Sequence, residues 1–224
     1  MFSASFLVSY AEGLPEADQQ ALYADLEAAG KALSDVSVIG IVLEPATQAP
    51  GNIMFEIGFP NQDAYEEAKG TDTWANLKDM LADTKRVSLY QFAAYGDDGI
   101  LKLTDTEKAT CHRLLFTHVR DGADPAMVEH AYEVMPYMQD FVPGFVNSKI
   151  SKVVESEGSQ TWDYVFECDY SDPSVYPGAY IMQPIHITYI DRFFEPACAQ
   201  YVFVPDLCTS VIETDGPFLA NYAE

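Results

Sequence analysis

Positive charge is scarce in this sequence. Lys and Arg number 12 against 35 Asp and Glu among 224 residues, which gives a formal net charge of -23. A surface of this sign repels the phosphates of nucleic acids and anionic lipid headgroups. We therefore expect neither nucleic acid nor a membrane as a partner, and we interpret the acidic surface mainly as a source of solubility.

Cysteine is also sparse, and its spacing gives no sign of metal or disulfide chemistry. The four cysteines form no CxxC pair and fall short of the density of a disulfide framework. They fit reduced thiols in a cytoplasmic protein. The N-terminus lacks the basic segment of a signal peptide, and no apolar run reaches the roughly 18 residues of a membrane span.

Glycine-rich phosphate loops and nucleophile elbows are missing as well. Their absence argues against nucleotide cofactors and acyl-enzyme chemistry, so we expect no cofactor and no metal. Hydrophobic residues nevertheless make up 48% of the chain and aromatic residues 13%. This composition predicts a packed globular protein.

Hydrophobic periodicity and turn residues divide the first part of the chain into strands and helices. The predicted order is strand, helix, two strands, helix, strand, with strands at 3–10, 36–43, 53–59 and 87–92 and helices at 15–33 and 63–85. This β-α-β-β-α-β order is the ferredoxin-like unit. Residues 1–95 are therefore expected to form a first domain.

The polar segment 96–108 is predicted to be a linker, after which the pattern restarts in a second domain over 109–224. Three prolines between 175 and 198 predict two or three short helices there. The remaining elements are strands at 111–119, 145–154, 162–169 and 201–213, the last broken at Pro205, and a helix at 124–141. The repeated order indicates an internal duplication.

Two segments of the second domain carry a family resemblance. Residues 179–186, Ala-Tyr-Ile-Met-Gln-Pro-Ile-His, are similar to the Tyr-x-x-His-Pro-x-His signature of the dimeric α/β-barrel (Dabb) family, also called stress-responsive A/B barrel proteins. Gln183 stands where that signature has its first histidine. Residues 111–116 resemble the first strand of the family, in which a histidine commonly precedes an apolar run.

The resemblance implies an α+β fold in which two ferredoxin-like β-α-β-β-α-β units pair their antiparallel sheets into one α+β barrel. Family members usually form this barrel as homodimers. Here the fused units imply an intramolecular pseudo-dimer, and a further homodimer stays open. Residues 3–95 contain no histidine and share only the order of elements, so they are expected to form a degenerate unit.

Some family members are cofactor-independent polyketide cyclases whose pocket residues move protons. Carried over by position, the resemblance implies His112, Tyr180 and His186 as catalytic residues. The chemistry of the side chains agrees, because an imidazole titrates near neutral pH and can act as a base. A phenol can donate a hydrogen bond to a developing oxyanion.

Leu114, Phe116 and Gln183 are expected to contact the substrate. His112, Leu114 and Phe116 share one face of a strand, because side chains alternate with period two. We expect that face to line an apolar pocket inside the barrel, suited to a small, largely apolar ligand without charge.

Two functions follow from these residues. The leading hypothesis is a cofactor-independent acid-base enzyme, a lyase, cyclase or isomerase, acting on a small aromatic or polyketide-like intermediate. The alternative is a non-catalytic stress-responsive or small-ligand-binding protein. A catalyst needs an open cavity on which both imidazoles converge, whereas a structural role predicts satisfied imidazoles in a closed interior.

Overall fold

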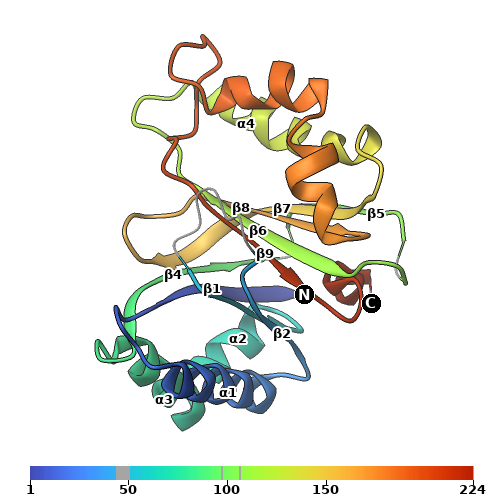
Figure 1. Ribbon diagram of the computed structural model, residues 1–224. Helices are drawn as coiled ribbons and strands as arrows, with labels where there is room; N and C mark the ends of the chain where they lie inside the picture. The colour runs from blue at the N-terminus through green and yellow to red at the C-terminus, as the bar shows by residue number, and fades with distance from the viewer. Residues whose placement is uncertain (44–50, 97, 106, 224) are drawn as a thin grey trace.

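The strands form a single curled antiparallel sheet with helices on its outer side (Figure 1). The computed structural model describes residues 1–43, 51–96, 98–105 and 107–223. Within them the sheet follows the path β2-β3-β1-β4-β7-β8-β6-β9, and β5 pairs with β7 beside this path. Two ferredoxin-like halves thus pair their sheets into one α+β barrel, which confirms the predicted fold class.

The described residues of the first half form four strands and three helices: β1 (Phe2–Tyr10), α1 (Glu16–Leu33), β2 (Val36–Ile41), β3 (Ile53–Phe59), α2 (Gln62–Lys69), α3 (Asp72–Ala82) and β4 (Val87–Tyr95). Helix α1 buries Leu22, Leu26 and Ala29, the stripe that its periodicity predicts. The single helix predicted over 63–85 is two helices. Thr71 causes the break, because its side chain accepts a hydrogen bond from the Trp74 amide and caps α3.

The second half has the same order of strands but less regular helices. Its elements are β5 (Ile100–Leu103), β6 (Cys111–Thr117), α4 (Pro125–Val134), η1 (Met135–Asp140), β7 (Phe145–Glu157), β8 (Tyr164–Tyr170), η2 (Pro173–Val175), η3 (Tyr176–Tyr180), η4 (His186–Ile190), η5 (Asp191–Phe193), β9 (Cys208–Glu213) and η6 (Phe218–Ala223). Strand β5 lies in the segment predicted as a linker. The final strand is interrupted around Pro205, as predicted, because β9 begins only at Cys208.

The two halves meet at both sides of the barrel. On one side β4 pairs with β7, from Phe92 opposite Glu157 to Tyr95 opposite Val153. On the other side the Leu43 amide donates to the Val211 carbonyl at 2.9 Å. There β2 approaches β9 so closely that a Cβ on Gly40 would lie 2.7 Å from Cβ of Ile212. Glycine is required at this contact.

The described residues form three large clusters of buried side chains and a small one around η6. We call the strands of the first half (β1–β4) the first sheet and those of the second half (β6–β9) the second sheet. One large cluster packs between the first sheet and α1–α3, one between the second sheet and the C-terminal helices, and one between the two sheets. The layer between the sheets contains Leu7, Met54, Ala93, Tyr95, Leu114, Phe116, Trp162, Val165, Cys208 and Ile212. It also holds the buried charges Glu56, His112, Lys149 and Glu167. Buried charged side chains therefore share the barrel interior with apolar ones, whereas an apolar pocket was expected there.

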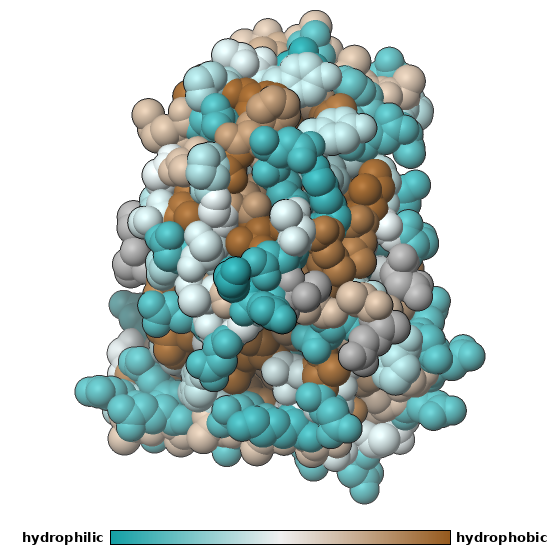
Figure 2. Space-filling model, turned by 90° about the vertical axis from the view of Figure 1, so that its right-hand side faces the viewer, coloured by the Kyte–Doolittle hydropathy of each residue, from teal (hydrophilic) through white to brown (hydrophobic). Residues whose placement is uncertain are grey.

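Hydrophilic residues dominate the outer end of the first half in Figure 2, whereas hydrophobic residues emerge in patches toward the middle of that face. The helical end of the first half is thus mainly hydrophilic on that face. In the parts of the chain that the structure describes, no helix combines the length and apolar character that crossing a bilayer requires.

Candidate functional site

Strand β6 carries three of the predicted site residues, all on one face of its sheet. His112, Leu114 and Phe116 point into the barrel, as their shared periodicity requires. Arg113 and Leu115 point to the opposite face, toward the C-terminal helices. Any site on the helix side therefore contains Arg113 in place of His112.

A pocket of about 340 Å³ lies on that helix side. This volume falls in the usual range for small-molecule sites, about 300 to 1,000 Å³. Its polar groups come from β6 and from the segment that runs through η3, η4 and η5. The lining residues are Arg113, Leu115, Met135, Tyr176, Tyr180, Ile181, His186, Ile190, Asp191, Phe194, Glu195, Pro205 and Leu207.

The guanidinium of Arg113 is the most unusual group in the pocket. It is 3% exposed and lies 4.6 Å from the ring centroid of Tyr176 and 5.2 Å from that of Tyr180. Its Nε donates to Thr209 Oγ1 at 2.9 Å, and Nη1 lies 3.8 Å from Cys168 Sγ. Within the described residues no carboxylate pairs with this charge.

The buried guanidinium places a positive charge at the inner wall of the pocket, which Asp191 and Glu195 also line. Buried charges are normally paired, because leaving water costs several kcal/mol that a counter-ion must offset. The aromatic faces of the two tyrosines offset part of that cost by cation-π attraction. A ligand oxygen that carries or develops negative charge would supply the missing partner.

Tyr180 and His186 meet in the same pocket. Their rings form an edge-to-face contact with centroids 4.8 Å apart. Burial raises the pKa of the Tyr180 phenol above its ordinary value, even though the charge of Arg113 acts to lower it, so the hydroxyl stays a donor. Nδ1 of His186 lies 3.2 Å from Oδ1 of Asp191, without the alignment of a hydrogen bond.

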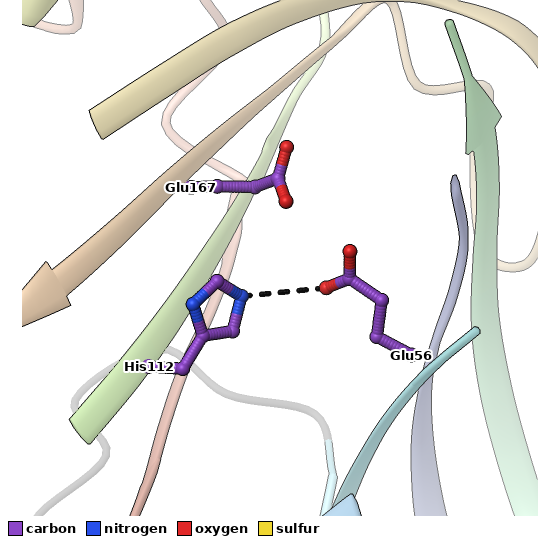
Figure 3. A group of neighbouring side chains, drawn as sticks. All are labelled: Glu56, His112 and Glu167. Carbon is purple, nitrogen blue, oxygen red and sulfur yellow. Dashed lines mark hydrogen bonds and ion pairs between the residues drawn. The ribbon is translucent and has the colours of Figure 1, made fainter. Parts of the chain in front are cut away.

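His112 occupies a different environment inside the barrel. Its Nδ1 lies 2.8 Å from Oδ1 of Asp169, and its Nε2 lies 3.3 Å from Oε2 of Glu56. Figure 3 shows Glu56 and Glu167 turned toward the imidazole from two other strands. Burial lowers the pKa of His112, but the hydrogen bonds to Asp169 and Glu56 outweigh it and raise the value to about 10.

The two glutamates beside His112 titrate in opposite directions. Burial raises the pKa of Glu56, but the hydrogen bond and charge of His112 outweigh it and hold the value below normal. Burial raises the pKa of Glu167 to about 8, against the attraction of Lys149. The pKa of Glu56 is thus shifted down and those of His112 and Glu167 are shifted up within one enclosed cluster.

The structure thus brings Tyr180 and His186 together and leaves His112 on the other side of the sheet. Leu114 and Phe116 are packed within the barrel, away from the pocket. The side chain of Gln183 is half-buried and donates to the carbonyl of Phe141, and Gln183 does not line the pocket. These positions follow from strand alternation, which fixes which residues share a face but not what that face meets.

Arg113 is the pocket residue that sequence reasoning missed. It directly follows His112 in the sequence, so the signal was an arginine within an otherwise apolar strand. Arginine in a run that reads as a fully buried strand is rare unless it is paired. That signal indicates a special environment but does not identify it.

No family model and no curated protein matches this sequence. Solved structures do match the fold. An anthrone oxidase-like protein superimposes with a TM-score of 0.62 at 11% identity, covering 95% of this chain and 90% of that chain. A candidate monooxygenase from Lactobacillus acidophilus NCFM gives a TM-score of 0.53 at 14% identity, covering 94% of this chain and 91% of that chain.

A candidate chlorite dismutase gives a TM-score of 0.52 at 12% identity, covering 100% of this chain and 99% of that chain. All three likenesses extend over nearly the whole length of both proteins, so the two halves and their arrangement are shared. At such low identity they establish a common α+β fold. Function must be argued from the site itself.

Proposed function

We propose that the pocket beside Arg113 binds a small, largely apolar compound, aromatic or polyketide-like, and catalyses cofactor-independent acid-base chemistry on it as a lyase, cyclase or isomerase. The observation that carries this proposal is the buried guanidinium without a carboxylate partner, in one pocket with Tyr180 and His186. It favours a ligand with an oxygen that becomes negatively charged.

In this mechanism His186 is the base. It removes a proton from a carbon or hydroxyl next to a carbonyl group, and Asp191 at 3.2 Å stabilises the imidazolium that forms. The charge left on the substrate moves to its carbonyl oxygen. Arg113 and the Tyr180 hydroxyl stabilise that oxyanion, and His186 returns the proton at the new position.

His112, Leu114 and Phe116 have no part in this proposal, because they face the barrel interior. Leu115, Met135 and the other apolar lining residues would hold the body of the ligand. The sequence predicts a ligand without charge. The pocket favours a neutral or weakly acidic compound with an oxygen that gains negative charge during binding or reaction.

Anthrone is a suitable probe, because one structural neighbour is anthrone oxidase-like and the CH₂ group of anthrone is acidic. We expect the protein to accelerate exchange of those protons with D₂O, followed by NMR. His186→Ala should abolish the acceleration, since a positioned base contributes about 100- to 10,000-fold. His118→Asn alters a histidine outside the pocket and serves as the control.

Saturation-transfer NMR on the same samples separates binding from catalysis. Binding without exchange favours the alternative function, a non-catalytic small-ligand-binding or stress-responsive protein. The position of His112 supports this alternative, because its imidazole faces Asp169 and Glu56 and does not converge with His186 on the pocket. Neither binding nor exchange with anthrone or other hydroxy-aromatic probes would contradict the proposed ligand class.

We also infer that the chain is a fused member of the Dabb family, with units over 1–95 and 109–224 joined by 96–108 and acting as an intramolecular pseudo-dimer in the cytoplasm. The repeated order of strands and the β4 to β7 pairing support this inference. Light scattering tests it, because a pseudo-dimer predicts a monomer of 24.8 kDa in solution. An obligate dimer would require a further interface.

A further inference from the structure

Three side chains with metal-binding atoms converge between the sheets, away from the pocket. They are Glu56 on β3, His112 on β6 and Glu167 on β8. One nitrogen or oxygen of each lies within 4.8 Å of the others, and all three side chains are 0% exposed. Figure 3 shows them pointing toward a common centre from strands of both halves.

We propose that Glu56, His112 and Glu167 bind one divalent transition metal ion that ties the two sheets of the barrel together. The ion would have a structural role, because the cluster is enclosed and lies on the opposite face of the second sheet from Arg113. This proposal is independent of the proposed reaction.

The spacing of His112 and Glu56 suits such an ion. Zinc binds nitrogen and carboxylate oxygen at about 2.0 to 2.2 Å, so ligands at a tetrahedral angle lie about 3.3 to 3.5 Å apart. Nε2 of His112 and Oε2 of Glu56 are 3.3 Å apart. A charge-assisted hydrogen bond normally brings such atoms to about 2.7 to 2.9 Å.

The imidazole is oriented as in known metal sites. Metal-binding histidines almost always donate their other ring nitrogen to a carboxylate or carbonyl, which fixes the ring. Here Nδ1 of His112 faces Asp169 at 2.8 Å. Asp169 is held in turn by Asn147 Nδ2 at 3.1 Å and by the Leu219 amide at 3.0 Å. Nε2 is thereby directed toward the two glutamates.

The carboxylates are oriented by hydroxyl groups in the same way. Tyr95 donates to Oε1 of Glu56 at 3.1 Å, and Tyr222 donates to Oε1 of Glu167 at 3.2 Å. Each glutamate thus has one oxygen held by a tyrosine and one left for other partners. Lys149 is 3.5 Å from the free oxygen of Glu167, a long contact for an ion pair.

The charges of the enclosed group can also accommodate a doubly charged ion. Glu56, Glu167 and Asp169 carry three negative charges when ionised, and Lys149 carries one positive charge. A divalent ion with a neutral His112 brings the enclosed group to zero. Because the set holds carboxylates and an imidazole without a thiolate, Zn²⁺, Mn²⁺ and Co²⁺ are suitable probes.

The first test uses the whole chain, unfolded in EDTA and refolded with Zn²⁺, Mn²⁺, Co²⁺ or no metal. After desalting, we expect about one equivalent of at least one metal per chain by mass spectrometry. We also expect a Tm several degrees above that of the metal-free protein, because an ion that binds only the folded state stabilises it. Less than a tenth of an equivalent of every metal, with an unchanged Tm, would overturn the proposal.

Variants then assign the ligands. Glu56→Gln and Glu167→Gln should each lower metal affinity by at least tenfold, whereas Glu155→Gln, at a part-exposed glutamate paired with Lys69, should leave it unchanged. If the two buried variants fail to fold, the site can be located by anomalous diffraction from crystals of the unmutated protein refolded with zinc. A peak between the three side chains supports the site, and a peak elsewhere or none overturns it.

Discussion

His112 and Arg113 are neighbours on β6, yet they lie in opposite kinds of environment. On the barrel side both nitrogens of the imidazole face carboxylates. On the pocket side the guanidinium contacts a hydroxyl, a thiol and two aromatic rings. A buried charge that faces opposite charges of the protein stabilises the fold, whereas a buried cation without a counter-ion indicates a place for a ligand with negative charge.

The largest difference between the barrel side and the pocket side is expected in the stability of variants at His112 and His186. His112→Ala leaves the carboxylates of Glu56 and Asp169 buried beside a cavity, so we expect it to lower the free energy of unfolding by about 3 to 5 kcal/mol. His186→Ala should cost less than about 1 kcal/mol, because its Nδ1 makes no hydrogen bond. Urea denaturation of both variants measures the two free energies of unfolding. Equal losses of stability would contradict the view that His112 is structural and His186 is not.

Arg113→Met should weaken ligand binding without weakening the fold. Charged hydrogen bonds contribute about 1.5 to 3 kcal/mol, which corresponds to a roughly 10- to 100-fold loss of affinity for an anionic or enolisable aromatic probe. The free energy of unfolding should stay the same or rise, because a buried unpaired charge is replaced by an apolar chain.

Arg120→Met is the matched control, since Arg120 also lies over a tyrosine ring, that of Tyr201, but outside the pocket. Calorimetric titration and thermal unfolding of both variants make the comparison. A large stability loss in Arg113→Met with unchanged binding would mean that this arginine is structural.

Tyr222→Phe should have an intermediate effect on the barrel side. Its hydroxyl donates to Oε1 of Glu167 and also contacts the Ser3 hydroxyl, so the variant leaves two buried groups with one partner fewer. We expect a loss of about 1 to 3 kcal/mol in unfolding free energy. Tyr137→Phe, at a tyrosine that is 55% exposed, should change it by less than about 0.5 kcal/mol.

The smallest effect concerns the thiol beside Arg113. Burial raises the pKa of Cys168 to about 12, despite the positive charge of Arg113 that acts to lower it. Burial likewise raises the pKa of Cys111 to about 11 and that of Cys208 to about 12. Because the thiolate is the reactive form, iodoacetamide at pH 8.5 should alkylate only the half-buried Cys198 in the folded protein.

Mass spectrometry identifies the modified residues, and the unfolded protein, in which all four thiols react, provides the control. Rapid alkylation of Cys168 in the folded chain would show that Arg113 activates this thiol. The pocket would then contain a nucleophile in addition to an acid and a base.

The strands could be predicted because their signals are local. Alternation over 3–10 and the β-rich runs at 53–59 and 111–119 gave strands within a few residues of β1, β3 and β6. The helix over 63–85 was predicted without its break, because the cap at Thr71 is a weaker signal than the apolar periodicity around it. Strand β5 was not predicted, because its four residues form a strand by pairing with β7, which is distant in the sequence.

The site could be predicted only in part. Tyr180 and His186 are six residues apart in one segment, so local geometry keeps them near each other. Glu56 lies 56 residues from His112, and no local pattern relates the two. The same limit applies to Arg113, whose missing counter-ion is a property of all the elements that surround it.

The sequence by itself determined the order of strands and helices, the acidic surface and the shared face of His112, Leu114 and Phe116. These properties depend on composition and on periodicity within short segments. Only the tertiary structure decided which groups each face of β6 meets. That choice depends on how the two sheets pair and on which helices cover them, and it determines which polar groups are paired and which are left for a ligand.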